Sequence, residues 1–369
     1  MFIQYIKNIN FKFLLVIFIL FAFSLLMILS ATDADINNIN RFVKVQSLSF
    51  ILGLVIMFIM IMIDYRMLGN FSWLIYVISI LLLLAVYIPG LGVVANNSRR
   101  WIDLGIINLQ TSELSKIGFI IVMAKYLSHE DKKLDSVKDL IVPILLMLPF
   151  IVLLLEQPDL GTSLVFVVVT VGMMFMSDLN LKIIFFGITS FLVSLPIVYS
   201  YLRPHQKVRI DAFLNPNDSS LPGNYHVMQS KITIGSGQVF GKGIFDGIYH
   251  KYNYLPVRES DFIYAVIGEE TGFVGTTIVI LMYIILLTQM LSMGSKAKDK
   301  FGGLIIYGVM FMFAFQVFEN IGMTIGLMPV TGITLPFLSY GGSSIVTNFI
   351  AIGLILSVYV RRMRFSEMN

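Results

Sequence analysis

Ten apolar stretches divide this chain, and each is long enough, or nearly so, to cross the hydrocarbon core of a membrane. Such a crossing needs about 20 helical residues. The stretches cover residues 12–31, 46–63, 72–90, 112–128, 139–155, 159–176, 181–201, 262–291, 302–326 and 341–360, and the fourth to sixth are short. Soluble domains contain about 25% charged residues, whereas this chain contains 13% charged and 57% hydrophobic residues. The sequence therefore predicts an all-α polytopic membrane protein with about ten transmembrane helices.

The distribution of lysine and arginine predicts how these helices are oriented, because cytoplasmic loops carry an excess of both. The first stretch is longer than a signal-peptide core of about 7–15 residues, so we expect it to be a retained helix. With both termini cytoplasmic, fourteen basic residues fall in cytoplasmic segments and five in short outer connections. The fourteen are Lys7, Lys12, Arg66, Lys125, Lys132, Lys133, Lys138, Lys182, Lys296, Lys298, Lys300, Arg361, Arg362 and Arg364; the five are Arg41, Lys44, Arg99, Arg100 and Lys116. We therefore expect both termini to lie in the cytoplasm.

The longest polar connection, residues 202–261, is expected to form one large extracellular loop. It contains Pro204, Pro216, Pro222 and a glycine cluster, which predicts an irregular segment rather than one helix. It has too few large apolar residues for a core of its own, so residues 1–369 form a single membrane domain. The net charge of +4 fits lysines near lipid headgroups better than a nucleic-acid surface. The chain has no cysteine, which excludes disulfides, thiol catalysis and cysteine metal sites.

A pair of opposite charges lies at the start of the fourth apolar stretch. Glu113 and Lys116 stand three residues apart, a spacing at which helix side chains meet. One interpretation is a surface ion pair, with the preceding Arg100 and Trp101 as anchors at the membrane interface. The other is that Lys116 faces a polar cavity and binds an anionic group of a ligand, because ionisable residues inside membranes are functional by default. The sequence leaves both interpretations open.

A second polar motif, EQPDLGTS at residues 156–163, separates two apolar stretches. We expect a tight outer turn, with Pro158 in the first turn of the next helix and acidic side chains near its positive end. Capping of a helix hairpin explains these residues, and we favour it over a role in a site.

A cluster of glycines around Lys242 is the third motif. The stretch GSGQVFGKG at residues 235–243 follows Arg203, Lys207 and Arg209, and glycines with cations can build a backbone nest for phosphate oxygens. The glycine spacing and the residue after Lys242 do not match a nucleotide-binding P-loop. Ordinary turns are the simpler interpretation, and the nearby arginines are what suggest a diphosphate.

Asp261 lies where the long polar loop ends and an apolar helix begins. A helix cap would lower the pKa of this carboxyl, whereas burial would raise the pKa and make it a better base; the sequence does not decide between them. At about 100° per residue, Glu269 and Glu270 point in different directions from Asp261, so at least one is expected to support helix packing. The spacings Gly268–Gly272 and Gly322–Gly326 are expected to permit close helix approach.

Six segments in order make the chain similar to the SEDS family (shape, elongation, division and sporulation) of bacterial cell-wall polymerases. They are RRWIDLG, QTSELSK, QPDLGTS, NYHVMQSKITIGSGQVFGKG, YLPVRESDFIYAVIGEETG and ENIGMTIGLMPVTGITLPFLSYGGSS. Each segment is weak evidence alone, but six in order with ten spans are highly specific and cover essentially the whole chain. The fourth segment and NIGMTIGLMPVTG resemble the rod-elongation branch, RodA, more closely than the division branch, FtsW.

The chain departs from the family pattern at several positions. Thr111 and Thr334 each replace a usual proline, and Ser260 precedes Asp261 where threonine is usual. Glu319 stands where an apolar residue is common, so we expect it to alter a cavity wall. These changes are conservative enough that activity is still expected.

The resemblance implies a peptidoglycan glycosyltransferase of the bacterial cytoplasmic membrane, which polymerises lipid II into glycan strands at the outer face during cell elongation. The transfer inverts the anomeric centre, so one base takes the proton of the acceptor hydroxyl while charge on the released undecaprenyl diphosphate is stabilised. Asp261 fits the catalytic base. The substrate-binding candidates are Lys116, Glu113, Arg209, Arg203, Lys242, Arg100 and Ser343.

The resemblance also implies partners and leaves further functions open. The expected partners are a class B penicillin-binding protein transpeptidase, which crosslinks the product, and other elongation-machinery proteins, with no nucleic acid. No cofactor is required for certain, and a divalent cation, Mg or Mn, bridging the diphosphate stays open although no ligand cluster indicates one. A lipid II flippase or other transporter would also use buried charges and broken helices, although no inverted repeat favours it. A division- or sporulation-branch polymerase and a non-catalytic scaffold also stay open.

Overall fold

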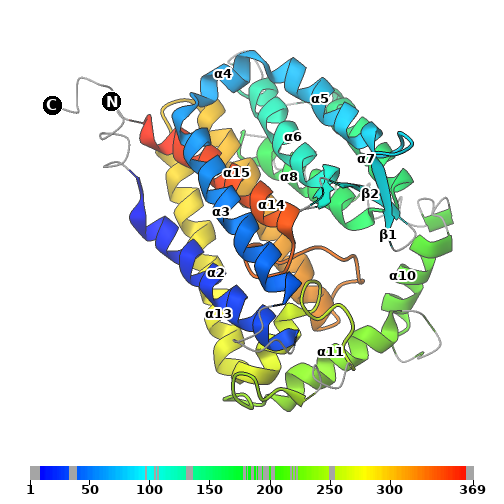
Figure 1. Cartoon of the computed structure of the whole chain (residues 1–369). Helices are drawn as coiled ribbons and strands as arrows, with labels where there is room; N and C mark the ends of the chain where they lie inside the picture. Colours follow the sequence, from blue (N-terminus) through cyan, green and yellow to red (C-terminus); the bar gives the residue numbers. More distant parts are fainter. Residues whose placement is uncertain are drawn as a thin grey trace.

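The protein is a bundle of long helices with one small sheet (Figure 1). The computed structural model describes residues 9–32, 40–95, 98–103, 105, 108–129, 136–177, 180, 182–183, 187, 189, 193, 199–200, 204–216, 218, 221, 223–248 and 254–362. The helices are α2 (Phe11–Ala31), α3 (Arg41–Met62), α4 (Tyr65–Asn70), α5 (Ser72–Ala85), α6 (Thr111–Leu127), η1 (Val137–Leu140), α7 (Ile141–Glu156), α8 (Leu160–Phe175), α10 (Pro204–Leu214), α11 (Asn224–Ser236), α13 (Ile263–Ser295), α14 (Lys300–Thr324) and α15 (Gly342–Val360). The strands are β1 (Gly92–Ala95), β2 (Ser98–Asp103) and β3 (Asn108–Gln110).

The predicted spans agree well with these helices. Nine of the ten correspond to α2, α3, α5, α6, α7, α8, α13, α14 and α15, while most of the span 181–201 lies outside the described residues. Within the described residues, six helices are long and apolar enough to cross a membrane by length and composition. The predicted short fourth and sixth spans are confirmed, since α6 has 17 residues and α8 has 16.

Polar side chains set where several of these helices begin. Asn10 and Asn40 precede α2 and α3, and each side chain accepts a hydrogen bond of 3.2 Å from the backbone N–H three residues on. Asp299 does the same for α14, at 2.8 Å from the N–H of Gly302. Such caps satisfy N–H groups that have no partner within the helix. The apolar runs therefore start as helices at defined residues.

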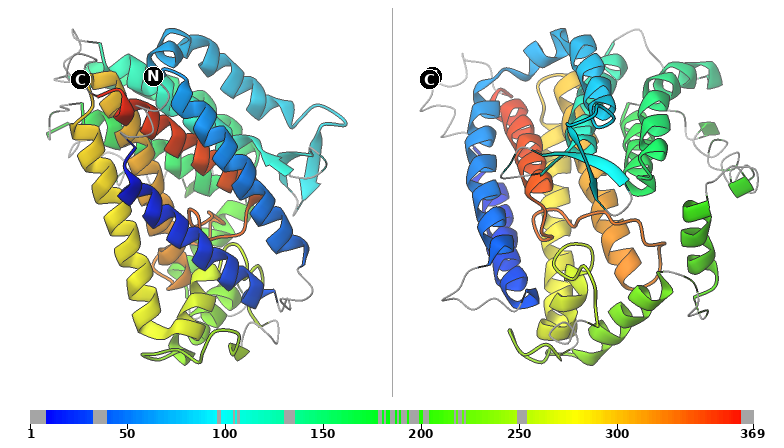
Figure 2. Two further views of the ribbon diagram at one scale, coloured as in Figure 1. Left: turned by 60° about the vertical axis from the view of Figure 1, so that its left-hand side comes forward. Right: turned by 45° about the vertical axis from the view of Figure 1, so that its right-hand side comes forward.

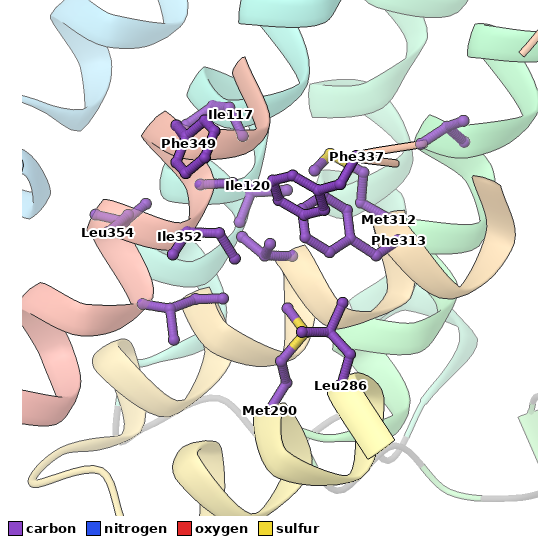
Figure 3. Close-up of a cluster of buried hydrophobic side chains, with 14 of the residues drawn as sticks. Ile117, Ile120, Leu286, Met290, Met312, Phe313, Phe337, Phe349, Ile352 and Leu354 are labelled. Carbon is purple, nitrogen blue, oxygen red and sulfur yellow. The ribbon is translucent and has the colours of Figure 1, made fainter. Parts of the chain in front are cut away.

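Small residues let the central helices approach closely. α15 packs along α3, and a Cβ added at Gly53 of α3 would lie 2.5 Å from the ring of Phe349 on α15. A Cβ at Gly353 of α15 would lie 2.9 Å from the backbone oxygen of Met57. Since lipid gives helices little hydrophobic reason to associate, such close packing is what holds a membrane bundle together. Phe337 and Phe313 join this apolar core from neighbouring segments (Figure 3).

The bundle has two chemically different ends. At one, the Tyr65 hydroxyl donates to Asp299 Oδ2 at 2.6 Å, and Arg361 donates to the Ile61 carbonyl at 2.9 Å. At the other end, called the loop end here, lie the three strands, the start of α8 and residues 325–341 (Figure 2). The excess of basic residues predicts that the Asp299 end faces the cytoplasm.

The structure adds two features at the loop end that the sequence did not predict. The strands β1, β2 and β3 form an antiparallel sheet in that order, with Trp101 opposite Gln110. The segment 202–261 is not irregular throughout, because α10 and α11 lie within it. Pro204 begins α10, Pro216 follows its end, and the glycine cluster at residues 235–243 lies at and after the end of α11.

Candidate active site

Asp261 lies at the loop end, in the turn just before α13. It does not cap that helix: the N-cap is Phe262, and no side-chain cap bond forms there. The carboxylate instead accepts a hydrogen bond from the Ser260 hydroxyl at 3.1 Å. The capping interpretation of this residue is therefore wrong, and the carboxylate has no structural task at the helix start.

The surroundings of Asp261 make it a better base than an ordinary aspartate. Burial raises its pKa to about 6, and the nearby Glu259 adds to the rise, while the bond from Ser260 and the charges of Arg209 and Arg100 lower it. The side chain is nevertheless partly exposed. Burial therefore outweighs the groups that lower this pKa, and a pKa close to the working pH favours proton transfer.

α14 holds the backbone around Asp261 in place. The amide of Asn320 donates to the Asp261 carbonyl at 3.0 Å and to the Ile333 carbonyl at 2.8 Å. Next to Ile333, Gly332 has a φ of 78°, and a Cβ there would lie 3.3 Å from Asp261 Oδ2. A glycine at this position avoids the strain of a positive φ and lets the 331–333 backbone pass beside the carboxylate. This segment therefore forms one wall of the site.

Arg209 reaches the same wall from α10. One guanidinium nitrogen donates to the carbonyls of Val330 and Thr331, at 3.1 Å and 3.3 Å. Thr331 in turn donates to the buried Glu319 at 2.6 Å. Both bonds come from Nη1, so with respect to the described residues the other guanidinium N–H groups are available for a ligand. Glu319 therefore supports the wall at Thr331, the residue whose carbonyl receives Arg209.

Arg100 is held by the motif at residues 156–163. It donates to the carbonyls of Gln157 and Pro158 and forms an ion pair of 3.6 Å with Asp159. Asp159 is buried and also caps α8, with Oδ1 accepting from the Thr162 N–H at 3.2 Å. The capping prediction for the acidic residue is therefore confirmed. Pro158 precedes the cap instead of lying in the first helical turn.

Glu113 and Lys116 do form an ion pair, but it is not on the surface. The Lys116 ammonium lies 2.7 Å from Glu113 Oε1, and the two side chains are 2% and 7% exposed. Glu113 Oε2 is buried with no hydrogen-bond partner among the described residues. The surface interpretation is wrong, because a pair this deep cannot be screened by water. A spare carboxylate oxygen beside an ammonium is what a polar ligand would meet here.

Two helices begin at the site without a side-chain cap. These are α6, after Gln110, and α15, after Gly341. The two starts touch, since the Gln110 N–H donates to the Ser343 hydroxyl at 3.0 Å. Helix N-termini carry free N–H groups and a positive dipole end, so they attract anions. Ser343, a candidate from the matched segments, therefore joins the two helix starts.

The glycine cluster at residues 235–243 has a structural role. The N–H groups of Lys242 and Gly243 donate to the carbonyls of Glu269 and Glu270, each at 3.0 Å, so they are not free to form a phosphate nest. The Lys242 ammonium is paired with Glu269 at 2.7 Å. Glu270 accepts from the Ser30 hydroxyl. Both glutamates thus support packing, and the assignment of Lys242 to the substrate is corrected.

Close approach explains the glycines that face this cluster. α13 is interrupted at Gly272, where φ is 66°, and a Cβ there would lie 2.3 Å from the Gly241 nitrogen. A Cβ at Gly237 would lie 1.9 Å from the Gly268 carbonyl. The predicted close approach at Gly268 and Gly272 is confirmed, although the partner is a loop and not only a helix.

The structure brings together only some of the predicted residues. Asp261, Arg209 and Arg100 interact electrostatically, and Arg203 lies outside the described residues. Sequence reasoning missed the roles of Asp159 and Asn320; the first was attributed to capping alone, although its place in a matched segment was a signal. No three acidic or histidine side chains gather as a metal site in the described part of the chain. No residues are therefore assigned to the Mg or Mn ion.

This arrangement suits group transfer from an anionic leaving group. One carboxylate can take a proton, two arginines carry positive charge, and two helix starts present free N–H groups. A base next to a preformed anion site supports attack by a hydroxyl while charge develops on a diphosphate.

Comparison with known proteins gives one consistent answer. Residues 11–364 match the family described as cell cycle protein, FtsW/RodA/SpoVE. Peptidoglycan glycosyltransferase MrdB of Escherichia coli K12 is 34% identical over 355 residues, covering 96% of this chain and 94% of the relative. Two solved structures each cover 96% of this chain and 98% of their own. One, described as structural coordination of polymerization and crosslinking by a peptidoglycan synthase complex, has a TM-score of 0.83 at 29% identity. The other, rod shape determining protein RodA of Thermus thermophilus, has a TM-score of 0.72 at 28% identity.

Proposed function

The chain belongs to the FtsW/RodA/SpoVE family, also called SEDS, and is a peptidoglycan glycosyltransferase of the multi-pass membrane type; we propose that it polymerises lipid II with Asp261 as the base. The observation that carries this proposal is the partly exposed carboxylate with a pKa near 6 beside two arginines. A carboxylate with a purely structural role at this position would cap α13, and Asp261 does not cap it.

Asp261 removes the proton from the attacking 4-hydroxyl of the acceptor sugar. The oxygen then bonds to the anomeric carbon of the donor as the bond to the diphosphate breaks, so the carbon inverts. The proton stays on the carboxyl, whose raised pKa lets it hold the proton until it is released to water. Asn320 and Ser260 keep the Asp261 turn in place during the transfer.

The leaving diphosphate gains negative charge, and the site supplies positive charge for it. Arg209 is fixed by the carbonyls of Val330 and Thr331 through Nη1, and its other N–H groups have no partner within the described part of the chain. The uncapped starts of α6 and α15 add N–H groups. Donors that are already oriented need no rearrangement in the transition state. Lys116, buried beside its glutamate, is proposed to contact the same group or the sugar next to it.

The setting proposed for this reaction is the outer face of the cytoplasmic membrane, with both termini in the cytoplasm. The excess of basic residues at the Asp299 end supports that orientation. We assign the protein to cell elongation because of its RodA-like segments and its likeness to a RodA structure. A class B penicillin-binding protein is the proposed partner, since a similar structure belongs to a complex that coordinates polymerization and crosslinking.

One experiment tests the polymerase directly. Purified protein with its transpeptidase is given lipid II, and glycan chains are separated on a gel, beside a lipid II transport assay in liposomes. We expect glycan chains from the unmodified protein and none from Asp261→Asn. Transport without any synthesis would overturn the proposal in favour of a flippase.

A further inference from the structure

A large pocket lies beside the candidate active site, between α10, α11 and residues 326–330. Its volume is about 830 Å³, within the range of about 300–1,000 Å³ that is usual for ligand sites. α11 contacts both α13 and α14 at the loop end (Figure 2). The pocket, called the α10–α11 pocket here, is thus next to the wall that carries Arg209.

The walls of the α10–α11 pocket are largely apolar. Side chains from all three bordering segments contribute, among them Ala212, Phe213, Val227, Met228 and Met328. Phe213 and Met228 are 39% and 49% exposed, so the apolar lining continues to the surface of the protein. A hydrocarbon chain would be removed from water inside this pocket and could leave along the exposed rim.

Several polar side chains line the pocket, and two of them are cationic. Arg209 and Lys231 both line it, and none of the described residues in its lining is acidic. Lys231 lies across Gly326, where a Cβ would come within 2.4 Å of the ammonium nitrogen. His226 also lines the pocket, and its buried Nδ1 has no hydrogen-bond partner among the described residues. The pocket therefore combines an apolar wall with two cations, of which Arg209 also interacts with Asp261 in the active site.

We propose that the α10–α11 pocket binds the phosphate-bearing end of an isoprenoid diphosphate, with Lys231 contacting the phosphate and the first isoprene units lying on Phe213 and Met228. This inference rests on the proposed function, because that reaction has such a lipid on its donor and releases it as a product. Arg209 belongs to both places, so a diphosphate on it could span from the pocket to the reacting sugar. An ordinary anionic phospholipid shares the phosphate and the apolar chain but lacks this link to the reaction.

Binding of soluble probes to the full-length protein separates these possibilities. Farnesyl diphosphate, farnesol and inorganic diphosphate are titrated onto protein in phosphatidylcholine nanodiscs, and the dissociation constants are compared. We expect clear binding only for farnesyl diphosphate, because both the charge and the chain are used. Equal binding of inorganic diphosphate would overturn the proposal, as would displacement of the probe by phosphatidylglycerol at similar concentrations.

Two variants and a matched control locate the binding. Lys231→Gln is expected to weaken farnesyl diphosphate binding about tenfold, and Met228→Gln is expected to weaken it through the apolar wall. Lys207→Gln is the control, because Lys207 is also on α10 but donates to the Ser200 carbonyl at 3.1 Å and should change binding less than about twofold. Lys231 and Met228 are exposed, so folding should be unaffected and a thermal melt checks this.

Glycan synthesis by the same variants keeps the two proposals apart. Lys231→Gln is expected to lower kcat/KM for lipid II, because it removes a cation from a diphosphate that gains charge in the transition state. If the unmodified protein synthesises glycan chains but Lys231→Gln binds the probe as well as the unmodified protein does, the proposed role of the pocket is refuted. The proposed polymerase activity is then unaffected. Absence of synthesis in the unmodified protein with its transpeptidase would instead refute the polymerase.

Discussion

Replacing Asp261 by Asn should abolish synthesis without destabilising the protein. The carboxylate makes no helix cap and receives one bond, from Ser260 at 3.1 Å. Its pKa rises from 3.8 to about 6 on folding, chiefly because of burial. A folded carboxyl with a raised pKa binds more protons than the unfolded one, so stability falls as the pH rises from about 4 to about 6.

The size of this effect follows from the pKa values. A shift of about 2 units corresponds to about 3 kcal/mol, and this is an upper bound because the side chain is partly exposed and screened by water. At pH 7.5 Asp261→Asn removes that cost and loses one hydrogen bond worth about 1 kcal/mol. The variant should therefore melt at the same temperature as the unmodified protein or slightly above it. Its rate of synthesis should fall by at least about 10²–10⁴-fold, the usual contribution of a general base.

The assay is glycan synthesis from lipid II between pH 5 and 8, beside a thermal melt. Synthesis by the unmodified protein should rise with pH, reach half its maximum near pH 6 and be about a tenth of its maximum at pH 5. Ser260→Ala removes a bond that lowers the pKa, so its profile should move to higher pH. A flat profile, wild-type synthesis by Asp261→Asn or a large drop in its melting temperature would refute this reasoning.

Other variants test the remaining charged groups. Removing one partner of a buried ion pair costs about 3–5 kcal/mol, so Lys116→Ala should lower both the melting temperature and synthesis. The double variant Glu113→Gln, Lys116→Met should restore the melting temperature but not synthesis. If synthesis also recovers, the pair has only a structural role. Arg209→Lys should slow synthesis about tenfold or more, because an ammonium cannot keep the guanidinium fork, whereas Lys207→Arg should be tolerated; equal rates would contradict the assignment. Lys242→Met removes the ammonium that faces a buried carboxylate, so it should lower the melting temperature while the rate per folded molecule is unchanged. A loss of rate without a loss of stability would instead show that Lys242 contacts the substrate.

The sequence by itself determined the membrane bundle, because an apolar run near 20 residues must satisfy its backbone within the lipid and does so as a helix. The apolar stretches also predicted the helix boundaries to within a few residues, because local side chains such as Asn40 and Asp299 cap the helices. The sequence also placed Asp261 at the junction of loop and helix, because that junction is a local change in polarity.

Only the tertiary structure decided which charges belong to the site. Lys242 was a candidate for the site in sequence, yet it pairs with Glu269, 27 residues away. Asp159 was interpreted as a helix cap alone, yet it also holds Arg100, 59 residues away. The sequence could not say whether the Glu113–Lys116 pair was buried or exposed, because spacing along a helix does not reveal what packs against that face. The pKa of Asp261 was open for the same reason: it depends on desolvation by segments far away in the chain, and only the packed fold brings those segments to the carboxylate.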